Sequence, residues 1–220
     1  MQYYPIFLDL QARPCLVIGG GTVAERKVES LLQARAQVTL ISPTCTPRLR
    51  SWAADQVITL YERPYRPGDL QGFSVVFAAT NDEMLHEKIA AEARKAGVFL
   101  NVVDRPALCS FIVPAIVSQG DLTLAISTGG ASPALAKKIR KTLEQLFGPE
   151  YDLALCLLAR VRERVAKNGL SSEERQQLFT TLTDAPLLDY LRERQIDKLN
   201  ALLQETVGAS CTLEELGLSL

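Results

Sequence analysis

Three consecutive glycines, Gly19, Gly20 and Gly21, are the residues of this chain with the clearest chemistry. They follow a short apolar run, residues 15–18, and precede a helical pattern. Because glycine has no Cβ, the chain can turn sharply there and a phosphate can approach the backbone. The first N–H groups of the helix and its dipole favour that negative charge. Gly19-x-Gly21-x-x-Ala24 therefore fits the fingerprint of a dinucleotide-binding turn.

The residues after the next predicted strand decide which dinucleotide fits. Many NAD-binding domains carry an Asp or Glu there for the ribose hydroxyls. This chain has Ser42, Pro43 and Thr44 instead, with no acid and no arginine at that position. Ser42, Thr44 or backbone groups are the candidates for the ribose. These residues leave the choice between NAD and NADP open, and a glycine turn without any ligand remains the alternative.

Asp104 is the candidate catalytic group. It ends the segment Asn101-Val102-Val103-Asp104, which follows the fifth predicted strand. A carboxylate at that position can act as a general acid or base, or bind a cation. The alternative is an aspartate that opens a turn before Pro106. The spacing alone does not separate the two interpretations.

Alternating strands and helices position these residues. The apolar runs predict strands over 14–18, 37–41, 57–61, 74–78 and 98–102, and helices over 22–34, 47–54 and 82–96. Apolar strands separated by helices are typical of a parallel sheet covered on both faces. The fold class is therefore α/β, with a Rossmann-like sheet. Ligands bind beyond the carboxyl ends of such strands, so we expect Gly19–Val23, Ser42–Thr44 and Ala79–Asn81 to surround one nucleotide, with Ala79 and Thr80 as cofactor contacts.

The second half of the chain has a different pattern. Apolar runs over 111–117 and 121–127 predict a strand pair, and Ser132 and Pro133 begin a helix that extends to 147. The remainder reads as helices over 150–168, 171–181, 186–193 and 195–207. We expect three domains: 1–113, 114–147 and 148–220. Lys137, Lys138 and Arg140 form a basic cluster that is either a solvated face or a site for an acidic ligand.

Composition excludes several function classes. The chain is 47% hydrophobic and 22% charged, with a formal net charge of −1, so neither nucleic acid nor a membrane is an expected partner. No apolar run approaches the roughly 18 residues of a membrane span, and the N-terminus lacks the features of a signal peptide. The expected location is cytoplasmic. Five scattered cysteines predict no zinc site or disulfide framework and are expected to be mostly buried. His86 is expected to be an exposed helical residue.

Four blocks of sequence together resemble a known family. They are Gly19-Gly20-Gly21-x-Val23-Ala24-x-Arg26-Lys27, Asn101-Val102-Val103-Asp104, Ser110-Phe111-Ile112-x-Pro114-Ala115, and Ser127-Thr128-Gly129-Gly130-x-Ser132-Pro133-Ala134-Leu135-Ala136. In this order and spacing they closely resemble the precorrin-2 dehydrogenase / sirohydrochlorin ferrochelatase family, the N-terminal module of siroheme synthases. The resemblance covers residues 1–145 strongly and the helical remainder loosely.

The resemblance implies an activity and roles for particular residues. It implies NAD-dependent oxidation of precorrin-2 to sirohydrochlorin, with Fe²⁺ insertion in some relatives, and Asp104 as the catalytic residue. Cofactor contacts would come from Gly21, Thr22, Val23, Ser42, Pro43 and Thr44. Ser127 and Thr128 would lie at the substrate, and Thr128 departs from a serine that is phosphorylated in some relatives. It also implies a homodimer formed through about residues 114–145, which makes that region a small α+β dimerisation region.

The basic side chains of the second half of the chain agree with a tetrapyrrole substrate. A tetrapyrrole precursor carries many carboxylates, which gives the basic side chains of Lys137, Lys138 and Arg140 a function. No protein-bound metal is needed. The alternative is an NAD(H)-sensing Rossmann regulatory module without turnover, which does not explain the block from Ser127 to Ala136.

Overall fold

The computed structural model describes residues 3–219 and forms two compact units, Met1–Val113 and Pro114–Leu220. Each unit has its own hydrophobic core. The three-domain division, with a further boundary at residue 148, stays a prediction. Over residues 3–219, no helix combines the length and the apolar character that crossing a membrane requires.

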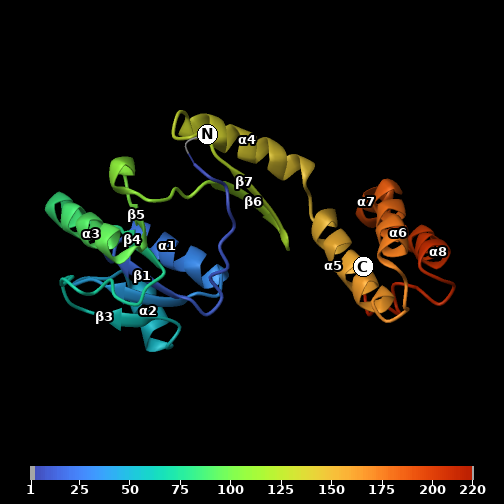
Figure 1. Cartoon of the computed structure of the whole chain (residues 1–220), viewed down its shortest axis with the longest axis horizontal. Helices are drawn as coiled ribbons and strands as arrows, with labels where there is room; N and C mark the ends of the chain where they lie inside the picture. Colours follow the sequence, from blue (N-terminus) through green and yellow to red (C-terminus); the bar gives the residue numbers. More distant parts are fainter. Residues whose placement is uncertain (1–2, 220) are drawn as a thin grey trace. The chain divides into compact units, whose positions relative to one another are not determined.

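The first unit is built on a parallel sheet of five strands (Figure 1). They are β1 (Pro14–Ile18), β2 (Gln37–Ile41), β3 (Thr59–Tyr61), β4 (Val75–Ala78) and β5 (Phe99–Val102). Their order in the sheet is β3-β2-β1-β4-β5, so β1 lies at the centre and its carboxyl end is flanked by those of β2 and β4. The predicted Rossmann-like sheet is confirmed. The strands β3, β4 and β5 each begin one or two residues later than the sequence predicted.

Helices cover both faces of this sheet. Side chains alternate along a strand, so Cys15 and Val17 of β1 pack in one core with α1 (Thr22–Gln33) and α2 (Pro47–Ala54). Leu16 and Ile18 pack in the other core, with α3 (Glu83–Ala96). Burial of apolar surface on both faces holds the carboxyl ends of the strands at one edge, where the glycine turn lies.

The segment after β5 differs from the prediction. The apolar run 111–117 was expected to be a strand throughout, but β6 begins only at Ala115. Residues 109–111 instead fold back along β5, after the short 3₁₀ helix η1 (Pro106–Leu108). The Oγ of Ser110 accepts a hydrogen bond from Leu100 N–H at 2.8 Å, and the Sγ of Cys109 lies 3.1 Å from Val102 N. Phe111 packs edge-on against Phe77, with ring centroids 5.5 Å apart.

The cysteines are less buried than predicted. All five are free thiols, but only Cys15 and Cys211 are buried, whereas Cys156 is exposed. Cys45 and Cys109 are half-buried in turns. The expectation that most of them are buried hydrophobic residues is therefore wrong. Its physical reason is that a thiol can also bond backbone groups in a turn, as Cys109 does.

The second unit begins with an antiparallel hairpin of β6 (Ala115–Gln119) and β7 (Leu122–Ile126). The hairpin is followed by α4 (Pro133–Leu146) and α5 (Glu150–Val165). The Ser132 side chain accepts a hydrogen bond from Leu135 N–H, which confirms the predicted N-cap. A Cβ at Gly120, in the hairpin turn, would lie 1.7 Å from Asp152 Oδ1, so the turn packs closely on α5.

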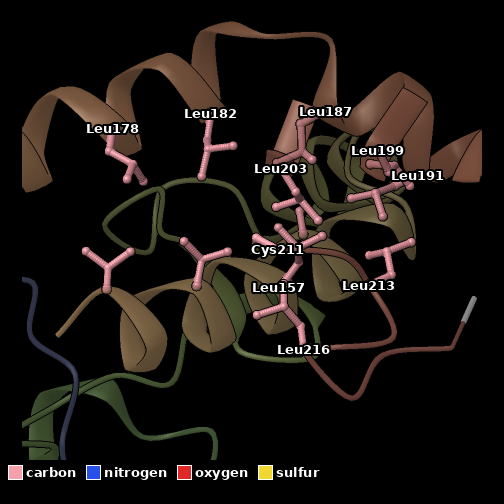
Figure 2. Close-up of a cluster of buried hydrophobic side chains, with 13 residues drawn as sticks. Leu157, Leu178, Leu182, Leu187, Leu191, Leu199, Leu203, Cys211, Leu213 and Leu216 are labelled. Atoms are coloured by element: carbon pink, nitrogen blue, oxygen red, sulfur yellow. The ribbon is translucent and has the colours of Figure 1, made fainter. Parts of the chain in front are cut away.

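The remaining helices form a bundle with a leucine-rich core (Figure 2). They are α6 (Ser172–Asp184), α7 (Leu187–Arg192) and α8 (Ile196–Thr206). Leu157 of α5, Leu182 of α6 and Leu203 of α8 are fully buried in this core. The segment after α8 adds Cys211, Leu213 and Leu216, which complete the core of this bundle.

Candidate functional site

The loops after β1, β2 and β4 meet at the glycine turn, as the sequence predicted. Gly19 has a φ of +113°, and a Cβ there would lie 2.1 Å from the carbonyl oxygen of Ala79. Gly19 N–H donates to Ile41 O at 2.9 Å, and Thr46 N–H donates to Gly20 O at 3.0 Å. Only glycine permits this approach. The turn is therefore fixed by backbone contacts to both neighbouring loops.

The start of α1 fits an anionic group. Its N-cap, Gly21, makes no side-chain capping bond, whereas Thr46 and Asp82 cap α2 and α3 with their side chains. A Cβ at Gly21 would have no neighbour within 4 Å, so the space beside it is open. The N–H groups of the first turn, including those of Thr22 and Val23, lack partners within the helix. They can hold the pyrophosphate of a dinucleotide.

The turn after β2 exposes fewer hydroxyl groups to a ribose than the sequence predicted, because Ser42 is buried. Ser42 is only 4% exposed. Its Oγ donates to Thr44 O at 2.7 Å and its N–H donates to Tyr61 O at 3.2 Å. The hydroxyl therefore shapes the turn, and the exposed residues at its tip are Pro43 and Thr44. The cofactor role predicted for these three residues stays a prediction.

Beyond β4, the Thr80 hydroxyl lies within hydrogen-bond distance of the buried His86. Thr80 Oγ1 accepts a hydrogen bond from Asp82 N–H at 3.0 Å and lies 3.4 Å from His86 Nε2. His86 is 4% exposed, so the prediction that it is an exposed residue is wrong. It lies on the same face of α3 as Ile89, Ala90 and Ala93. The His86 Nδ1 atom has no hydrogen-bond partner among residues 3–219.

Asp104 lies two residues after the end of β5 and has a φ of +60°. Few residue types other than glycine adopt this conformation, and aspartate and asparagine are among the most tolerant. Asp104 is exposed and lines an open pocket of about 490 Å³, together with Asn101 and with Val23 at the start of α1. The Asn101 side chain donates to Phe111 O at 3.1 Å. The pocket therefore brings the predicted catalytic carboxylate next to the helix that follows the glycine turn.

Two cations of the pocket were missed as site residues. Arg26 and Lys27 of α1 line the same pocket as Asp104. In the sequence they lie between the apolar residues Ala24 and Val28 and end the first block of the family resemblance, which implied no role for them. Only the folded chain, in which Asn101 and Val102 at the end of β5 line the same pocket, shows that they face a cavity. Within residues 3–219, no group of three or more His, Cys, Asp or Glu side chains is placed to hold a metal ion.

The substrate residues predicted from the second half of the chain lie in the second unit. Ser127 Oγ accepts from Gly129 N–H at 3.1 Å, and Thr128 Oγ1 donates to Ser132 O at 3.1 Å. Both hydroxyls thus stabilise the turn before α4. Arg140 forms an ion pair with Glu144. Lys137 and Lys138 are exposed. Their roles toward a substrate stay predictions.

Two family models match this chain. One, described as "Putative NAD(P)-binding", matches residues 6–115, which is half of the chain. The other, described as "Sirohaem biosynthesis protein central", matches residues 119–146. The first covers the parallel sheet and its glycine turn, and the second covers the hairpin turn, β7 and α4. The match to the first model agrees with the expected dinucleotide cofactor.

Curated relatives carry the name siroheme synthase. The one from Nitrosomonas europaea is 37% identical over 190 residues, which is 86% of this chain and 40% of that protein. The one from Nitrosococcus oceani is 42% identical over 179 residues, 81% of this chain and 38% of that protein. The chain therefore spans less than half of the length of these relatives.

A solved structure matches over nearly the whole chain. It is "SirC, precorrin-2 dehydrogenase", with 29% sequence identity and a TM-score of 0.72. The match covers 89% of this chain and 100% of that one. Sequence, fold and order of regions thus agree, and the chain belongs to the precorrin-2 dehydrogenase / sirohydrochlorin ferrochelatase family, which includes the N-terminal module of siroheme synthases.

Proposed function

We propose that this chain oxidises precorrin-2 to sirohydrochlorin with NAD⁺ in siroheme biosynthesis. The observation that carries the proposal is the position of Asp104. Its carboxylate lines a pocket beyond β5, at the strand edge where the glycine turn and the open start of α1 also lie. The similarity to a precorrin-2 dehydrogenase over 89% of the chain supports the same activity.

The glycine turn and Asp104 have different roles in this reaction. When bound, NAD⁺ supplies a hydride acceptor. The glycine turn and the first N–H groups of α1 bind its pyrophosphate and fix its position. Oxidation removes one hydride and one proton from the tetrapyrrole, and Asp104 accepts the proton as the hydride leaves. The products are sirohydrochlorin, NADH and a proton that the exposed Asp104 releases to solvent.

The proposal includes a homodimer and a cytoplasmic setting. Three apolar side chains of the second unit, Ile116, Leu135 and Leu146, are 46%, 49% and 59% exposed. A second copy of the chain would cover such residues. All five cysteines are free, which suits a reducing compartment. Sedimentation of the purified chain tests the dimer.

Absorbance spectroscopy tests the activity. The purified chain is incubated with precorrin-2 and NAD⁺, and we expect the spectrum of sirohydrochlorin to appear together with NADH at 340 nm, roughly one NADH for each macrocycle as hydride transfer requires. A chain that binds NAD⁺ without any turnover would instead be a nucleotide-sensing module. Addition of Fe²⁺ to the finished reaction measures whether metal insertion follows.

A further inference from the structure

The cavity that Asp104 lines also holds two cationic side chains, so positive charge exceeds negative charge among its lining residues. Arg26 and Lys27 both line it, and neither forms an ion pair with a carboxylate among residues 3–219. Arg26 is exposed and Lys27 is half-buried. Adjacent cations repel one another, and burial makes a charge costlier. Such a pair is stabilised when a ligand supplies negative charge.

The acids nearest in sequence are engaged elsewhere. Glu25 accepts a hydrogen bond from Thr46 Oγ1 at 2.6 Å and lies 3.5 Å from Arg48 Nη1. Glu29, which is three residues after Arg26 and so within reach of it on a helix, pairs with Arg48 Nη2 at 2.5 Å. Arg48 of α2 thus forms ion pairs with both Glu25 and Glu29. Arg26 and Lys27 therefore stay available to a ligand.

The Lys27 side chain is half-buried, and its ammonium group is partly shielded from bulk solvent. Its Nζ lies 5.2 Å from the centroid of the Phe77 ring, a cation–π distance. Burial, and then the positive charge of Arg26, lower the pKa of the Lys27 ammonium. An anion beside the pair opposes both effects, so binding of a carboxylate and retention of the Lys27 proton favour one another.

We propose that Arg26 and Lys27 bind carboxylate side chains of the tetrapyrrole and so orient the macrocycle against Asp104. The identity of the macrocycle rests on the proposed function, and the carboxylate chemistry rests on the pocket. Arginine can bind a carboxylate with two parallel hydrogen bonds, and lysine adds a point charge. A polycarboxylate macrocycle offers several such groups at fixed spacing.

The cofactor phosphates are the competing ligand for this pair. The open N–H groups at the start of α1 can already bind these phosphates. Neither the three glycines nor the turn Ser42–Thr44 lines the cavity. Arg26 follows Thr22 by four residues, about 6 Å along the helix axis. Of the predicted cofactor residues only Val23 lines the pocket, so the pocket adjoins the phosphate site on the same helix.

Porphyrin binding tests the pair without any turnover. The probes are uroporphyrin, which has eight carboxylates, and coproporphyrin, which has four, titrated into the whole chain by fluorescence. We expect Arg26→Gln and Lys27→Gln each to raise the Kd for uroporphyrin about tenfold, as loss of one charge-assisted bond does. Lys27→Arg should keep most of the affinity. Lys88→Gln, which alters an exposed lysine of α3, is the matched control.

The Kd for NAD⁺, measured on the same variants, separates the two ligands. We expect it to stay within twofold of the unaltered chain. A higher Kd for NAD⁺ together with an unchanged Kd for uroporphyrin would assign Arg26 and Lys27 to the cofactor phosphates and overturn the inference. An unchanged Kd for both ligands would overturn it as well. Thermal melting of each variant confirms that it is folded.

Failure of the inference differs from failure of the proposed function. If the unaltered chain oxidises precorrin-2 and neither variant raises the KM for it, the inference is wrong and the function stands. If the chain oxidises no precorrin-2 but loses uroporphyrin affinity in both variants, the carboxylate site stands and the function is wrong.

Discussion

The backbone of Gly20 lies directly against that of Thr44, because a Cβ at Gly20 would be 1.9 Å from the Thr44 carbonyl oxygen. The same Cβ would lie 2.8 Å from Ser42 Oγ. The glycine turn and the turn after β2 are therefore one packed unit, and the middle glycine serves that packing rather than contact with a ligand.

Gly20→Ala should therefore damage the fold and the cofactor site together. We expect a loss of about 1–3 kcal/mol in the free energy of unfolding, typical of an overpacked site, and weaker NAD⁺ binding. Denaturant unfolding and NAD⁺ titration measure the two effects. Gly21→Ala is the matched variant, since its Cβ would meet no atom within 4 Å. It should unfold normally and lose NAD⁺ affinity only. Equal stability of both variants would contradict the packing argument.

Asp104→Asn should separate catalysis from binding. Asparagine tolerates a φ of +60° nearly as well as aspartate, so the turn after β5 should keep its shape. We expect the rate of precorrin-2 oxidation to fall about 10²- to 10⁴-fold, the usual contribution of a general base. The Kd for NAD⁺ should not change. Single-turnover absorbance measurements check the rate, and an unchanged rate would remove Asp104 from the catalytic role.

The stability of the second unit should depend on pH through Glu150. Glu150 is 6% exposed and pairs with Arg192 Nη2 at 2.8 Å. Hydrogen bonding from Arg192 lowers the pKa of the Glu150 carboxyl. Its stabilising contribution is therefore complete above the usual glutamate pKa of about 4.3 and is lost as the pH falls through the lower value in the folded state.

Thermal melting between pH 7 and pH 3 measures this dependence. Glu150→Gln should lower the melting temperature at pH 7 and make it fall less steeply in acid. Glu163→Gln is the control, because that residue is exposed and its ion pair, with Arg160 at 3.4 Å, is exposed too. If both variants kept the acid slope of the unaltered chain, another carboxylate would carry it.

Ser110→Ala should weaken the end of the sheet. The Ser110 hydroxyl accepts the N–H of Leu100 at 2.8 Å, and Leu100 is 2% exposed. Loss of that partner should cost about 1 kcal/mol of unfolding free energy, the net value of a typical hydrogen bond. Denaturant unfolding measures it against Ser51→Ala, whose hydroxyl makes only an exposed contact to Asp55. A larger loss in Ser51→Ala would contradict the assignment.

Local signals were enough to predict the sheet and its glycine turn. The strand β1 reads as a short apolar run that ends at glycine, and the carboxyl-end rule then places Ala79 and Asp104 at the same edge. The site pocket required more than local signals. Arg26 and Lys27 lie on an amphipathic helix, and no local signal shows that they line one cavity with residues at the end of β5.

Two errors have physical reasons that the residues themselves show. His86 shares the spacing of Ile89, Ala90 and Ala93 on α3, so its periodicity indicated burial while its polarity suggested exposure. The run from Phe111 was read as a strand because apolar runs favour strands. Here Phe111 packs edge-on against Phe77 instead, and Pro114, which lacks an N–H to donate, directly precedes β6.

The bonds from Ser110 and Cys109 to the backbone of β5 have a consequence for how copies of this chain associate. A strand from a neighbouring molecule could pair with β5 only by displacing a hydroxyl and a thiol that already occupy the outward N–H groups of Leu100 and Val102. The parallel sheet is therefore closed to extension on that side. Crowded solutions of the chain should not form β-linked aggregates through this strand.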